Sequence, residues 1–120
     1  MQEQMNDLDR LLDIQHYSRF ILERRPQNEN DLLNDELLQL GILKALENIG
    51  EAANQISRGT KAEFQQLDWK TMIKARHVYA HDYFKIDWSK IWLSLNKIDF
   101  ETIIEGAEEI IQIIKTRYSQ

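Results

Sequence analysis

The sequence predicts an all-α protein, folded as an antiparallel bundle of four or five helices. One proline and four glycines in 120 residues leave room for long uninterrupted helices. Apolar residues recur at three- and four-residue spacing along most of the chain, as on amphipathic helices, and no segment shows the alternation typical of strands. The length suits one compact domain, which we expect to span residues 1–120.

The first expected helix carries apolar residues at helical spacing from Leu8 to Ile21. Asn6 or Asp7 is the expected N-cap, because a short polar side chain there accepts a hydrogen bond from the first turn. Pro26 is expected to end this helix, since the residue before a proline is disfavoured in the α conformation.

A long second helix is expected from Asp31 to Ser57, followed by Gly59 in a left-handed turn. Gly41 and Gly50 fall inside this helix, where close packing against a neighbour would offset their low helix propensity. The apolar positions that define the helix are Leu33, Leu37, Leu40, Leu43, Leu46, Ala53 and Ile56.

Three aspartates in the second half of the chain are candidate helix N-caps. Asp68 is expected to cap a helix that starts at Trp69 and runs towards His81. Asp87 or Asp99 can cap the later helices, including an amphipathic helix that carries Ile91, Trp92 and Leu95. The last helix has the clearest apolar stripe: Ile103, Ala107, Ile110, Ile111, Ile114 and Tyr118.

Composition narrows the possible functions. The absence of cysteine excludes disulfides, thiolate metal ligands and thiol nucleophiles. A polar, acidic start and the lack of an apolar run of about 20 residues predict a cytoplasmic protein without a membrane anchor. A net charge of −5 argues against general coating of nucleic acid. However, segment 58–90 has seven basic and four acidic residues, and its local positive charge can attract phosphate.

One eight-residue stretch of that basic segment is rich in reactive groups. It contains a guanidinium, two imidazoles, a carboxylate and two phenols: Arg76, His77, Tyr79, His81, Asp82 and Tyr83. Arginine binds phosphate oxygens in a bidentate fork, and histidine transfers protons near neutral pH. The combination is suited to phosphodiester cleavage without a metal or another cofactor.

The spacing of Arg76 and His81 does not place both side chains on one face of a regular helix. Five residues on a regular helix leave the two side chains about 140° apart. Either the helix ends before His81, or the groups meet a second copy across an interface. A symmetric homodimer would supply two histidines, one to accept the 2′-hydroxyl proton of RNA and one to protonate the leaving 5′-oxygen. On spacing alone, however, such a pair is often only structural.

The residues Arg76, His81 and Tyr83 form an Arg-x4-His-x-Tyr motif, which closely resembles the HEPN superfamily and its HepT-type ribonuclease toxins. The stretches 45–53, 83–87 and 91–92, together with Trp69, resemble the family in the expected order. The resemblance covers roughly residues 8 to 115.

The resemblance implies that Arg76 and His81 are the catalytic pair of a metal-independent, homodimeric endoribonuclease. It implies 2′,3′-cyclic phosphate and 5′-hydroxyl ends on the RNA. The toxin would belong to a type VII-like toxin–antitoxin system, whose antitoxin is a minimal nucleotidyltransferase. That partner would neutralise the toxin by transferring AMP to the motif tyrosine, here Tyr83, which would place charge and bulk in the RNA cleft.

Several neighbours of the pair are candidate supporting residues. The family commonly has asparagine after the arginine; His77 stands there, and its imidazole can replace the amide as a hydrogen-bond donor. Glu51 could orient the guanidinium of Arg76 if it is buried near it, or be an exposed or structural carboxylate. Asp82 could pair with nearby cations. Tyr79 could line the cleft, although core packing is favoured.

Two other functions remain open from the residues alone. His77 and His81 share a helical face at i, i+4, so with Glu47 and Glu51 they could form a metallohydrolase site, although no HExxH or ExxH motif is present. Alternatively, the chain could be a non-catalytic helical module that binds nucleotides or a partner.

Overall fold

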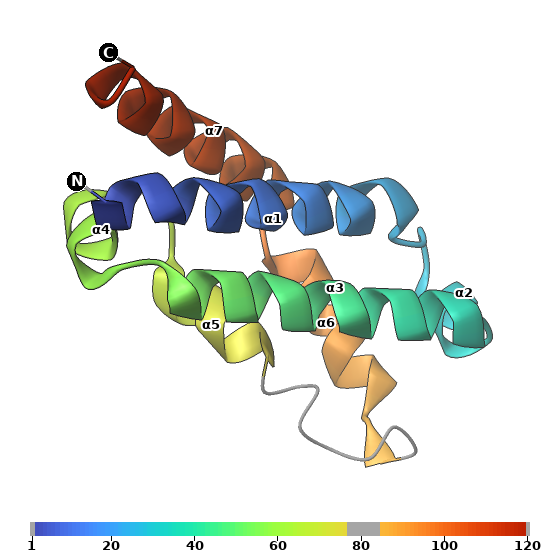
Figure 1. The fold of residues 1–120 in the computed structure, drawn as a ribbon. Coiled ribbons are helices and arrows are strands. Elements are labelled where there is room, and N and C mark those ends of the chain that lie inside the picture. Colours follow the sequence, from blue (N-terminus) through green and yellow to red (C-terminus); the bar gives the residue numbers. More distant parts are fainter. Residues whose placement is uncertain (1, 77–84, 120) are drawn as a thin grey trace.

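The described part of the protein, residues 2–76 and 85–119 of a computed structural model, is helical and contains no strand. This confirms the predicted all-α class. Seven helices lie within these residues (Figure 1): α1 Gln2–Arg24, α2 Glu29–Leu33, α3 Glu36–Gln55, α4 Arg58–Glu63, α5 Trp69–Lys74, α6 Trp88–Lys97 and α7 Phe100–Arg117.

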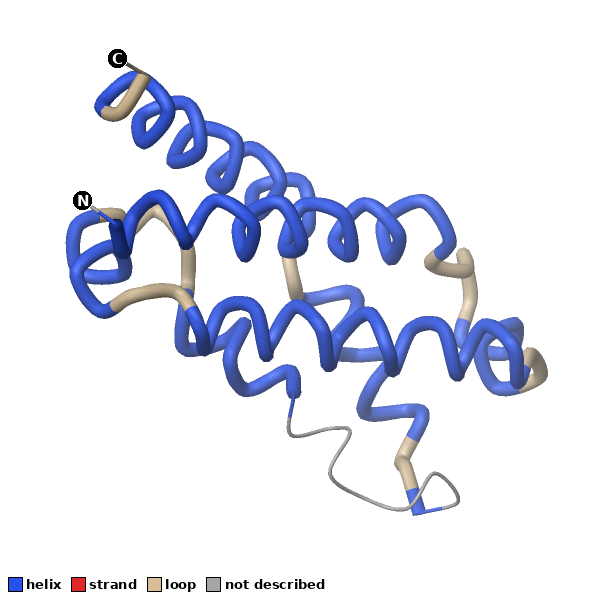
Figure 2. Tube along the Cα trace, in the orientation of Figure 1, coloured by secondary structure: helices blue, strands red, loops and turns tan. Residues whose placement is uncertain are grey.

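The three long helices form the body of the bundle. Helix α1 lies between α3 and α7 and runs antiparallel to both, while α5 packs against α3 and α6 against α2 (Figures 1 and 2). The core between them is aliphatic, and its fully buried side chains include Leu11, Ile14, Ile42, Leu95, Ile110 and Ile114. Within the described residues, no helix is long and apolar enough to cross a membrane.

The predicted caps Asp68, Asp87 and Asp99 each precede a helix and accept a backbone hydrogen bond from its first turn. The stripe predicted for the last helix is also confirmed. Its alanine and isoleucines are buried in α7, and half-buried Tyr118 lies at the helix end.

The single long helix expected from Asp31 to Ser57 is wrong, because the chain breaks at residues 34 and 35. Asp35 is extended, with φ −128° and ψ 92°, and its carboxylate accepts the Leu38 N–H at 3.0 Å. The side-chain amide of Gln39 donates to the carbonyl of Leu32 at 2.9 Å. These bonds replace helical bonds across the break, so the expected helix becomes α2 and α3.

Part of the apolar series expected for this helix is not buried. Leu33, Leu37 and Leu40 are 43%, 82% and 48% exposed. The buried face of α3 begins with Gln39 and Ile42.

The first helix starts earlier than expected, at Gln2, so neither Asn6 nor Asp7 is its N-cap. Asp7 instead is 3% exposed inside α1 and accepts three hydrogen bonds from the start of α4. The donors are the Ser57 N–H at 3.0 Å, the Ser57 hydroxyl at 2.7 Å and the Thr60 hydroxyl at 2.6 Å.

The start of α4 also differs from the turn expected at Gly59. The expected left-handed turn is absent, since no described glycine has positive φ. Helix α3 ends at Gln55, and its C-cap Ile56 is extended. Ser57 follows directly as the N-cap of α4, and Gly59 lies inside α4.

Asp7→Ala is expected to destabilise the protein by about 3 kcal/mol, because it leaves the buried Thr60 hydroxyl and the half-buried donors of Ser57 without their acceptor. The measurement is urea unfolding followed by circular dichroism. Asp9→Ala, at an exposed position of the same helix, is the control and should change stability by less than about 0.5 kcal/mol. Equal midpoints for the two variants would contradict the role given to Asp7.

Candidate active site

The candidate site is built around Arg76, which follows α5. Trp69 and Met72 are buried and fix α5 on the bundle, and the Trp69 indole donates to the Phe64 carbonyl at 2.8 Å. The chain continues from Lys74 through Ala75 in the α region, with φ −58° and ψ −29°. Arg76 is therefore held at the end of a packed helix.

Gly50 brings α3 unusually close to the backbone of Arg76. A Cβ atom at Gly50 would lie 2.6 Å from the Arg76 nitrogen and 2.7 Å from its Cβ, closer than non-bonded atoms approach. Only glycine permits this packing without a shift of the chain. The close packing expected at Gly50 is confirmed, and it fixes the position of Arg76 against α3.

The next residue of α3 contacts the Arg76 side chain. The Nη1 atom of Arg76 lies 3.3 Å from Oε1 of Glu51, and the side chains are 28% and 48% exposed. This bond uses one of the five N–H donors of the guanidinium, so the group keeps donors for an anion. Glu51 contacts Arg76 at the surface, whereas the orienting role considered for it assumed a buried carboxylate.

The remaining candidate residues of the motif lie outside the described residues: His77, Tyr79, His81, Asp82 and Tyr83. Among the described residues, no group of three or more histidine, aspartate or glutamate side chains is arranged to hold a metal ion. Glu47, considered above as a metal ligand, bonds Lys44 on its own helix at 3.3 Å.

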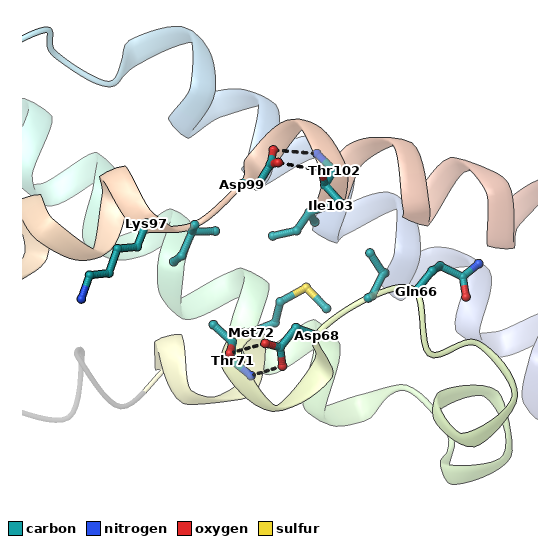
Figure 3. Close-up of a pocket in the computed structure, with 10 residues that line it drawn as sticks. Gln66, Asp68, Thr71, Met72, Lys97, Asp99, Thr102 and Ile103 are labelled. Atoms are coloured by element: carbon teal, nitrogen blue, oxygen red, sulfur yellow. Dashed lines mark hydrogen bonds between the residues drawn. The ribbon is translucent and has the colours of Figure 1, made fainter.

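Two adjoining cavities lie beside α5, and no pattern in the sequence predicted them. The larger, of about 330 Å³, separates the first turns of α5 and α7 (Figure 3). We call it the Asp68–Asp99 cavity. Each aspartate accepts both the backbone N–H and the hydroxyl of the threonine three residues later, at 2.7–3.1 Å. These bonds from Thr71 and Thr102 lower the pKa values of Asp68 and Asp99.

The smaller cavity, of about 250 Å³, lies nearer to Arg76. We call it the Lys74–Lys97 cavity. It shares Thr71, Lys97 and Ile98 with the larger one, and its other lining residues are Leu46, Lys74, Ala75 and Ser94. Three separate helices supply these side chains, so no local pattern in the sequence marks the cavity.

Comparison with known proteins places this arrangement in a family. A family model described as "Ribonuclease HepT-like" matches residues 1–115. The chain belongs to the HepT-like ribonuclease family. Membership confirms the predicted resemblance and assigns the chain to a family of hydrolases that act on RNA.

Curated relatives carry related names. Two are proteins of Methanocaldococcus jannaschii. "Putative RNase MJ1380" is 33% identical over 63 residues, 52% of this chain and 58% of the relative. "Putative RNase MJ0127" is 32% identical over 87 residues, 72% of this chain and 70% of the relative. "Probable ribonuclease HepT" of Thermococcus cleftensis is 31% identical over 67 residues, 56% of this chain and 61% of the relative.

The matched region therefore spans less than two thirds of the first and third of these relatives. No solved structure matches the chain.

Proposed function

We propose that this protein is a metal-independent endoribonuclease in which Arg76 and His81 are the catalytic pair. The observation that carries the proposal is the side chain of Arg76, held by Glu51 yet partly exposed, in a chain of the HepT-like family. A guanidinium in this setting can bind phosphate oxygens and stabilise the charge that develops on them.

The proposed reaction is an internal transesterification of RNA. The 2′-oxygen bonds to phosphorus as one His81 accepts its proton, and the bond from phosphorus to the 5′-oxygen breaks. The leaving oxygen takes a proton from a second histidine. The products are a 2′,3′-cyclic phosphate and a 5′-hydroxyl. A homodimer of two single-domain chains, each spanning residues 1–120, would supply both histidines.

We further propose that the enzyme is the toxin of a toxin–antitoxin pair in the cytoplasm. The partner is a minimal nucleotidyltransferase that silences it by transferring AMP to Tyr83. An adenylated phenol two residues from His81 would add negative charge where the RNA phosphate binds. His77, Tyr79 and Asp82 are proposed to support the site.

The test is cleavage of a structured RNA by the purified protein in EDTA, with Tyr83 confirmed unmodified by intact mass. The expected result is cutting at the same rate with and without the chelator, and ends that carry 2′,3′-cyclic phosphate. His81→Ala should cut nothing above background. Unmodified wild-type protein that leaves RNA intact would overturn the enzymatic proposal and favour a binding role. Cutting that EDTA abolishes would favour the metallohydrolase.

Glu51→Gln is expected to lower kcat/KM for RNA about tenfold, because the amide keeps the size of the side chain but loses the charge that orients Arg76. Glu47→Gln, one turn earlier on α3, is the matched control and should stay near wild type. In the Arg76→Ala background, Glu51→Gln should have no further effect, since Glu51 acts through Arg76. Equal losses for the two glutamine variants, or additive losses in the double variant, would argue against this positioning role.

A further inference from the structure

We propose that the Lys74–Lys97 cavity binds one nucleotide of single-stranded RNA next to the scissile phosphate. The inference rests on the proposed ribonuclease function and adds to it a substrate-binding subsite outside the Arg-x4-His motif. It follows from the position of the cavity, its apolar lining and the charge of its rim.

The cavity is continuous with the candidate active site. Ala75, which lines it, is bonded to Arg76 in the chain. Leu46, on the opposite wall, is one helical turn from Gly50, the residue that touches the Arg76 backbone. One turn of α-helix rises about 5.4 Å. A nucleotide adjacent to a phosphate at Arg76 is therefore within reach of the cavity.

The shape and lining of the cavity suit a nucleobase. Leu46 is buried, and Ala75 and Ile98 are half-buried, so they give an apolar surface of the kind that takes the face of a base. The Ser94 hydroxyl can donate to or accept from a base edge. The volume of about 250 Å³ lies just below the range of ordinary small-molecule sites, about 300 Å³ upwards, which indicates a single base.

The rim of the cavity supplies the matching charge. Lys74 ends α5 and Lys97 ends α6; both side chains are exposed, and both line the cavity. Two ammonium groups around an apolar floor complement a nucleotide, which has an apolar base and an anionic phosphate. Sequence-specific recognition of RNA relies chiefly on such unstacked bases.

The neighbouring Asp68–Asp99 cavity limits the path that the bound RNA can take. Its two carboxylates repel phosphate, and their oxygens already accept bonds from Thr71 and Thr102. In Figure 3 the Lys97 side chain extends away from the Asp99–Thr102 pair. The nucleotide is thus confined to the Lys74–Lys97 cavity, and the strand continues towards Arg76.

The test measures binding of a short single-stranded oligonucleotide that is 2′-O-methylated throughout and so cannot be cleaved by attack of its 2′-oxygen. Fluorescence anisotropy gives Kd at several salt concentrations for the full chain. Lys74→Gln and Lys97→Gln should each raise Kd about three- to tenfold and reduce the slope of log Kd against log salt by about 0.7, because each removes one phosphate contact.

Ser94→Leu distinguishes binding of a base in the cavity from non-specific electrostatic attraction between the lysines and the RNA phosphates. Leucine would fill the cavity without changing the charge, so Kd should rise about tenfold with the salt slope unchanged. Ser89→Leu, also on α6 but about 140° around the helix, controls for added apolar surface. Lys115→Gln, near the end of α7, controls for loss of one positive charge. Both controls should bind as wild type, and circular dichroism should show that all variants are folded.

The outcomes separate this inference from the proposed function. If the wild-type protein binds and cuts RNA but the cavity variants behave as their controls, the subsite is wrong and the ribonuclease proposal stands. If the wild-type protein neither binds the oligonucleotide nor cuts RNA, both fail. Lysine effects without an effect of Ser94→Leu would show electrostatic attraction only and would overturn the base-binding cavity.

Discussion

Arg76→Ala is expected to lower kcat/KM for RNA cleavage about a thousandfold and to leave the protein as stable as wild type. Removal of one group that stabilises charge in a transition state costs about a hundred- to a thousandfold in rate. The fold should not suffer, because the ion pair with Glu51 is partly exposed, and such pairs contribute only about 0–1 kcal/mol. Alanine also keeps the Cβ atom that faces Gly50.

The measurement is steady-state cleavage of a fluorogenic RNA, with urea unfolding of the same samples. Arg76→Lys is an informative second variant, because lysine keeps the charge but cannot form the bidentate fork. Its activity should lie between those of wild type and Arg76→Ala. Arg58→Ala, at an exposed position on α4, is the matched control. Cleavage at the wild-type rate by Arg76→Ala would mean that the reaction does not use Arg76.

The starts of α5, α6 and α7 were predictable from the sequence, because their signal is local. Asp68, Asp87 and Asp99 each precede an apolar helical pattern, and each caps a helix. A carboxylate that accepts an N–H two or three residues later needs no other part of the chain. The apolar stripe of α7 was predictable for the same reason.

Features that depend on tertiary contacts were not predictable from the pattern. Leu33, Leu37 and Leu40 keep helical spacing with the buried leucines of α3, so periodicity alone places them in the same apolar series. The structure nevertheless leaves these three leucines exposed. Asp7 has the residue type of an N-cap, but its carboxylate serves donors 50 and 53 residues away.

The candidate site likewise has one feature that the sequence could predict and one that it could not. The contact between Glu51 and Arg76 could be proposed from the sequence, because Glu51 adjoins a small-residue patch that invites a close helix. The Lys74–Lys97 cavity could not, because its walls come from α3, α5 and α6. Local chemistry thus suggested Arg76 as a candidate, whereas the surface beside it depends on how three helices pack.

Gly50→Ala is expected to disturb the site and the fold together. The new Cβ atom would meet the backbone nitrogen of Arg76 at 2.6 Å, and the backbone cannot rotate away as a side chain could. Overpacking of this kind costs about 1–3 kcal/mol, against a gain of about 0.5–1 kcal/mol from better helix propensity. The net expectation is a loss of about 1 kcal/mol in stability. The end of α5 must also move away from α3, which would lengthen the contact of Arg76 with Glu51 and lower kcat/KM.

The same substitution at another helical glycine supplies the control. Gly59 lies in α4, and a Cβ atom there would meet nothing within 4 Å. Gly59→Ala should therefore raise stability by about 0.5 kcal/mol and leave cleavage unchanged. The measurement compares the urea unfolding midpoints and the RNA cleavage rates of the two variants. If Gly50→Ala is as stable and as active as Gly59→Ala, close packing of α3 does not fix Arg76. A loss confined to Gly50→Ala ties the position of the guanidinium to a single missing methyl group on the neighbouring helix.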